Sequence, residues 1–104
     1  MSKDMVIASY RAREGADDAL GALLEKGWRL LTDLGLVAAD SPHLLLRRAD
    51  DDRDWVEVFA WVPGGSEAAH AHPDVRAHWE RVDQILDDSG TGLDRRFVKY
   101  ERHA

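Results

Sequence analysis

The sequence predicts an α+β protein of ferredoxin-like order, βαββαβ, with a four-stranded antiparallel sheet and helices on one face. Three patterns predict it: a β-leaning run at 5–10 precedes a long helical period, residues 54–62 alternate as a strand, and a second helical period precedes a last strand at 96–102. Hydrophobic residues make up 44% and charged residues 33%, the balance of a globular chain. At 104 residues we expect one domain, 1–104.

The first helical segment follows Gly15 and ends before Gly35. Its apolar residues recur at helical spacing from Leu20 to Leu34. A glycine inside a helix costs about 1 kcal/mol relative to alanine. We therefore expect Gly27 to lie where this helix comes close to the sheet.

Residues 43–48 and 54–62 are expected to pair as an antiparallel hairpin across a short acidic turn. Alternation in the second of these strands separates two faces. Ser66 is the expected N-cap of a short helical turn after the hairpin, and Pro73 starts the longer helix. One face carries Trp55, Glu57, Phe59 and Trp61, and the other Val56, Val58, Ala60 and Val62.

The strand at 54–62 is apolar on both faces, whereas two helices cover only one face of such a sheet. An uncovered apolar face usually marks an interface, and a two-fold dimer is the commonest oligomer. We therefore expect a homodimer whose sheets pair face to face and cover the side of Trp55, Phe59 and Trp61. The alternative is that a terminus or a loop covers this face.

Charge and composition exclude several classes of partner. The formal net charge of −6 argues against a nucleic-acid surface, which leans on basic residues. There are no cysteines, so disulfides and thiolate sites are excluded. The run 1–4 lacks the apolar stretch of a signal peptide, and no apolar run approaches the roughly 20 residues of a membrane span. We expect a soluble, cytoplasmic protein without nucleic-acid or membrane partners.

A family resemblance rests on the run Val58 to Trp61, the run Ser66 to His70, and Pro73, Val75 and Trp79. This pattern resembles the antibiotic-biosynthesis-monooxygenase-like superfamily of dimeric α/β barrels. The resemblance implies a pocket between sheet and helices, and cofactor-independent oxygenation of an aromatic or quinol-like substrate. Its haem-degrading branch has Asn on the first strand, which residues 5–10 lack, so haem is not expected and no cofactor is predicted.

Two residues are candidates for catalysis. His70 matches the family's histidine before proline, so the resemblance implies a hydrogen bond to a ligand at the pocket mouth and removal of a phenolic proton. The alternative is an exposed helix-end histidine. Glu57 stands among aromatic residues, where burial would raise its pKa and suit it to acid–base chemistry. The alternatives for Glu57 are a face that is only half covered, or pairing with an arginine such as Arg47 on the neighbouring strand.

Aromatic residues predict an apolar ligand pocket, although aromatics at such positions also serve as plain core. His72 either contributes to the pocket or only caps the following helix, and His78 is expected on a helix flank. The candidate ligand-binding residues are Tyr10, Phe59, Trp61, His72 and Trp79.

No metal site is predicted. His70 and His72 are two residues apart, which is the wrong spacing for one helix face. The acidic run 50–54 lacks the glycine and the closing glutamate of a calcium loop. Residues 90–92 follow a helix, the reverse of a phosphate-binding loop.

Two hypotheses for the function remain open. The first is a dimeric small-molecule-binding protein that acts as a cofactor-independent monooxygenase. The second is a non-catalytic ligand carrier, sensor or stress-associated interaction module. An open cavity with His70 or Glu57 pointing inward favours the first, and a cavity filled by side chains favours the second.

Overall fold

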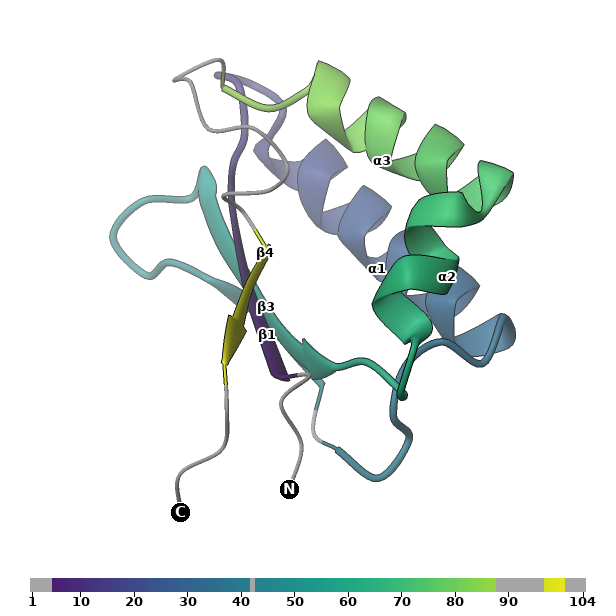
Figure 1. Cartoon of the computed structure of the whole chain (residues 1–104). Helices are drawn as coiled ribbons and strands as arrows, with labels where there is room; N and C mark the ends of the chain where they lie inside the picture. Colours follow the sequence, from purple (N-terminus) through teal and green to yellow (C-terminus); the bar gives the residue numbers. More distant parts are fainter. Residues whose placement is uncertain (1–4, 42, 88–96, 101–104) are drawn as a thin grey trace.

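A computed structural model describes residues 5–41, 43–87 and 97–100. Its strands form one antiparallel sheet in the order β2-β3-β1-β4, and the helices lie together on one side of it (Figure 1). The predicted α+β, ferredoxin-like fold is confirmed. The elements in chain order are β1 (Met5–Arg11), α1 (Asp17–Asp33), β2 (Leu44–Arg47), β3 (Asp54–Ala60), α2 (Gly65–Ala71), α3 (Pro73–Gln84) and β4 (Phe97–Tyr100).

Several boundaries differ from the sequence prediction. The strand β3 ends at Ala60, and Trp61 continues it only as an isolated bridge to Val37. The predicted cap at Ser66 is wrong, because α2 begins one residue earlier, behind a left-handed Gly64 with φ of 75°. Glycine adopts that conformation without the steric cost that a side chain brings. Some sequence predictions fall outside the described residues. They concern the N-terminal run 1–4, the loop at 88–94, and residues 96, 101 and 102 of the last strand.

The core lies between the sheet and the helices. Along β1 every second residue is buried, namely Val6, Ala8 and Tyr10, as the two-residue period of a strand requires. The helix α1 packs its buried stripe of Leu20, Leu24 and Leu31 into the same layer. This layered core fixes the side chains of β3 that point toward the helices.

The two faces of the sheet are covered in the opposite sense to the prediction. The face with Trp55 and Phe59 packs against the helices, because α1 offers Gly21, where a Cβ would come within 2.6 Å of the Trp55 ring. On the other side Ala60 is buried, but Val56 and Val58 are half-buried and Leu46 is 50% exposed. We call this side the open face; it carries Ile7, Leu44, Leu46, Val56, Val58, Val98 and Tyr100, which the strand register places in adjacent rows.

Gly27 also has a different neighbour from the one predicted. A Cβ there would overlap Nε2 of His78 on α3, so this glycine allows α1 to approach α3 rather than the sheet. Its cost to the helix is therefore offset by close packing between two helices. Among the described residues, no helix is both long enough and apolar enough to cross a membrane.

Candidate functional site

The most unusual group in the interior is the carboxylate of Glu57, at the centre of β3. Its cross-strand neighbours are Ala8 on β1 and Leu45 on β2, so apolar side chains flank it on both sides. Glu57 is only 6% exposed. Burial raises the pKa of Glu57 above its ordinary value, and a hydrogen bond from His43 partly opposes that rise. The sequence prediction of a buried carboxyl with a raised pKa agrees with this geometry.

His43 is the partner of Glu57, with 2.9 Å between Nε2 of the imidazole and Oε2 of the carboxylate. The imidazole stacks on the Trp28 ring, with 3.6 Å between centroids and 5° between the planes. Trp28 in turn meets Phe59 edge to face. The pair of Glu57 and His43 is therefore held by an aromatic cluster.

Sequence reasoning missed the role of His43, because the strand register that brings it to Glu57 is seen only in the structure. Leu45 pairs with Glu57, and His43 stands two residues before Leu45, which places all three side chains on the same face of the sheet. The predicted alternative, pairing of Glu57 with Arg47, is wrong. Arg47 lies further along the strand, over the ring of Trp55, and pairs with Asp17 at 2.6 Å.

A small cavity of about 20 Å³ adjoins Glu57 between the sheet and the helices. A cavity of this size accommodates a single water molecule. Eight of its ten lining residues are buried; Trp28 and Trp79 are half-buried and reach the surface. The full lining is Tyr10, Leu24, Gly27, Trp28, Leu31, Glu57, Phe59, His78, Trp79 and Val82.

The structure brings four of the seven predicted site residues together and leaves three outside. Tyr10, Glu57, Phe59 and Trp79 line the cavity. Trp61 is buried behind Phe59, with 5.0 Å between ring centroids. His70 is exposed and meets the outer Trp79 ring edge-on at 5.1 Å. His72 caps α3, where its Nδ1 accepts a hydrogen bond from the Asp74 amide at 3.2 Å.

His78 is a further wall residue that the sequence did not single out. The prediction of a helix-flank position is wrong, because Gly27 leaves room for the imidazole between α1 and α3 and His78 is buried. Burial lowers the pKa of His78, and the positive charges of Arg81 and Lys26 lower it further. The imidazole is therefore neutral at pH 7 and offers the cavity one N–H donor and one acceptor.

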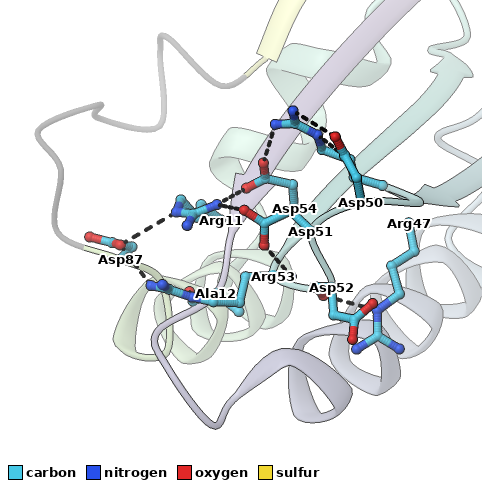
Figure 2. A network of polar contacts seen from close by, with 10 residues as sticks. Arg11, Ala12, Arg47, Asp50, Asp51, Asp52, Arg53, Asp54 and Asp87 are labelled. Carbon is cyan, nitrogen blue, oxygen red and sulfur yellow. Dashed lines mark hydrogen bonds and ion pairs between the residues drawn. The ribbon is translucent and has the colours of Figure 1, made fainter.

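A second polar cluster lies at the end of the β2–β3 hairpin. It differs from the cavity in that its carboxylates are paired with arginines. Arg11 contacts Asp51 at 2.9 Å and Asp54 at 2.6 Å, and Arg53 contacts Asp87 at 2.8 Å (Figure 2). Hydrogen bonds and charge from arginine lower the pKa of Asp51. The acidic run 50–54 thus forms a lattice of ion pairs, which we call the hairpin network.

A shallow hollow of about 650 Å³ lies beside this network at the edge of the open face. Its three guanidinium groups, of Arg11, Arg47 and Arg48, are all engaged by aspartates. The hollow therefore offers little uncompensated positive charge to an anion. Within 5–41, 43–87 and 97–100, no group of three or more potential ligand side chains is arranged to hold a metal ion.

The chain was compared with known proteins. No protein-family model matches it, and no curated protein matches it. Solved structures do match: an antibiotic biosynthesis monooxygenase has a TM-score of 0.74 at 16% identity, covering 96% of this chain and 98% of that one. SnoaB, a cofactor-independent oxygenase from Streptomyces nogalater, has a TM-score of 0.66 at 16% identity, covering 88% of this chain and 98% of that one.

A solved structure of a protein with a different activity also matches this chain. Tetracenomycin F2 cyclase from Streptomyces glaucescens, a type-II polyketide cyclase, has a TM-score of 0.58 at 17% identity, covering 96% of this chain and 97% of that one. The chain therefore has the antibiotic-biosynthesis-monooxygenase-like fold. Because proteins of this fold differ in activity, the function has to be argued from the residues of the site.

Proposed function

We propose that this protein binds a small, largely apolar aromatic molecule between the sheet and the helices and oxygenates it without a cofactor. The observation that carries the proposal is the Glu57 carboxylate, buried beside a cavity with aromatic walls. A carboxylate whose pKa is raised by burial is a stronger base than one in water. It is thus suited to take a proton from a phenol or a quinol.

The proposed reaction begins with that proton transfer. Loss of the hydroxyl proton makes the ring an electron-rich anion, which reacts with dioxygen without a metal or flavin. Trp28, Phe59 and Trp79 would hold a flat ring by stacking and edge contacts. The neutral imidazole of His78 would hydrogen-bond to a second oxygen of the substrate. The fold shared with SnoaB supports this proposal as an analogy.

The site must open before a ring can enter, because about 20 Å³ holds no more than a water molecule. Trp28 and Trp79 are the two lining residues that reach the surface. Rotation of Trp79 would widen the cavity from outside and leave the stack of Trp28 on His43 in place. His70 packs against the outer edge of Trp79 and would meet a ligand there, at the mouth rather than at the base.

The proposal includes a homodimer formed through the open face. Four large apolar side chains on this face, those of Leu44, Leu46, Val98 and Tyr100, are 43–50% exposed. Exposed apolar surface of this extent is typical of an interface, and two copies pairing sheet to sheet would cover it. Native mass spectrometry is expected to give a dimer mass for the wild type and a monomer mass for Leu46→Asp. A monomeric wild type would contradict the dimer.

One observation favours a different function, that of a non-catalytic carrier or sensor. The cavity is nearly filled by side chains, as expected for a protein whose interior serves packing alone. A carrier would bind aromatic ligands and leave them unchanged, and a plain structural core would bind none.

Oxygen consumption separates these functions. The purified protein would be incubated with a panel of hydroquinones and naphthohydroquinones, with an oxygen electrode following uptake and calorimetry following binding. The proposal predicts binding together with oxygen uptake above the rate of autoxidation. Binding without uptake would favour the carrier, and neither binding nor uptake would contradict both.

A further inference from the structure

We propose that His43 is a positioning and relay residue that carries the substrate proton from Glu57 to the solvent. The inference deepens the proposed function and rests on it, since it assigns the route by which a base inside the protein is regenerated. It follows from the arrangement of two side chains and one aromatic ring. Nothing in the sequence pattern alone singled out His43.

The pair spans the boundary between the interior and the surface. The Glu57 side chain is 8% exposed and lines the cavity, whereas the His43 side chain is 21% exposed and does not line it. The 2.9 Å between Oε2 of Glu57 and Nε2 of His43 is a hydrogen-bond distance across which a proton can move. A proton that arrives at Glu57 therefore has a path of one step toward water.

The Trp28 ring keeps this path in register. The imidazole lies flat on the indole, with 3.6 Å between centroids, and in this position its Nε2 is at hydrogen-bond distance from the carboxylate. The bond to Glu57 uses Nε2, and 21% of the His43 side chain is exposed, so the imidazole can exchange protons with solvent. A histidine is the side chain best suited to this task near neutral pH.

The proposed step moves one proton and no electrons. The O–H bond of the phenol breaks, and the carboxylate of Glu57 accepts the proton. The imidazole accepts that proton at Nε2 while its own proton is on Nδ1, and the resulting imidazolium releases the Nδ1 proton to water. The phenolate stays in the site. Exchange with water then returns the imidazole proton from Nε2 to Nδ1, so the pair regains its starting charge and tautomer before the next proton arrives.

The other titratable groups that face Glu57 do not provide such an exit. Tyr10 from β1 and His78 from α3 line the cavity, but both are buried. The residues that α1 contributes to the lining, Leu24, Gly27, Trp28 and Leu31, do not titrate. Ala8 and Leu45, the cross-strand neighbours, do not titrate either. Within the described part of the chain, His43 is thus the titratable partner of Glu57 that is also partly exposed.

Two substitutions separate a relay from a structural contact. His43→Gln keeps a hydrogen bond to the carboxylate and a flat group over Trp28, yet it cannot accept and release a proton. His43→Ala removes the ring and leaves room for free imidazole. Hydroquinone-dependent oxygen uptake would be measured across pH for both variants, with and without added imidazole. The absorbance of bound 4-nitrophenol would report ligand binding and its ionisation in each variant.

The relay predicts that both variants bind 4-nitrophenol like the wild type while turnover falls about 10- to 100-fold, the order of a proton-transfer contribution. Imidazole should restore His43→Ala but not His43→Gln, and the restored rate should follow the concentration of neutral imidazole. If His43→Gln turns over within about twofold of the wild type, or imidazole restores nothing, the relay is wrong and the proposed function stands. A wild type without binding or uptake would overturn the proposed function and the relay with it.

Discussion

The two acidic regions of this molecule, the interior around Glu57 and the hairpin network, place the same chemical group in opposite surroundings. Glu57 has one imidazole partner and apolar neighbours, and burial raises its pKa. Asp51 has a guanidinium partner at 2.9 Å close to solvent, and this hydrogen bond lowers its pKa. The first carboxylate accepts a proton more readily than an ordinary glutamate, and the second less readily than an ordinary aspartate.

The difference indicates that partner and burial, rather than the number of acidic residues, decide where chemistry can occur. The run 50–54 holds four aspartates, and contacts with arginine stabilise the charged form of Asp50 and Asp51. The single glutamate of β3 lacks such compensation. Substitutions at Glu57, at Asp51 or at their neighbours therefore test whether the buried carboxylate acts as a base and the paired one does not.

The largest effect is expected from removing the charge at each place in turn. Glu57→Gln should lower hydroquinone-dependent oxygen uptake about 100-fold or more, because the proposed base is lost while its shape is kept. The matched change in the hairpin network, Asp51→Asn, should leave uptake unchanged, since Asp51 contacts no cavity residue. Oxygen-electrode rates for both variants check this prediction. Equal losses in both would mean that the two regions do not differ in function.

The next effect concerns the packing that brings His78 to the cavity. Gly27→Ala should lower the free energy of unfolding by about 1–3 kcal/mol, because its methyl group overlaps the imidazole of His78. The better helix propensity of alanine, about 1 kcal/mol, opposes this loss. Urea unfolding would measure it.

The double variant Gly27→Ala/His78→Ala serves as control, since it removes both overlapping groups. The cost of Gly27→Ala should be smaller in that background than in the wild type. The same cost in both backgrounds would show that the overlap does not determine it.

A smaller effect is expected at the hairpin network. Arg11→Gln removes contacts to Asp51 and Asp54 and should lower the urea midpoint at low salt. The difference should shrink as salt is added, because exposed ion pairs are screened. Arg29→Gln, an exposed arginine for which the described residues provide no ion pair, is the control and should show no such salt dependence.

The smallest effects are those of pH, and they have opposite signs. The pKa of Asp51 is lowered by folding, so its contribution to stability is present above its ordinary value of 3.8 and is lost as pH falls through the folded pKa. The pKa of Glu57 is raised, so its contribution is present below 4.5 and is lost as pH rises through the folded pKa. Relative to the wild type, Glu57→Gln should gain stability with rising pH and Asp51→Asn should lose it. Urea titrations from pH 3 to pH 8 check the two slopes.

The fold could be predicted from periodicity, because the apolar pattern of the long helix and that of the alternating strand are each complete within one continuous segment. The covered face could not, since Trp55 and Val56 are both apolar and only Gly21 on a distant helix decides which side fits the larger ring. The Glu57 environment followed from its neighbours on β3. Its partner His43 did not, because the strand register that brings the two together is not written in either segment alone.

The central claim, that Glu57 is a buried base held apart from an ordinary acidic surface, can be measured directly. Carbon-13 NMR of the side-chain carboxyl groups, assigned through Glu57→Gln and Asp51→Asn, would follow both through a pH titration. The account predicts that Glu57 titrates above 4.5 and Asp51 below 3.8 in the same sample. A Glu57 carboxyl that titrates at or below 4.5 would contradict it.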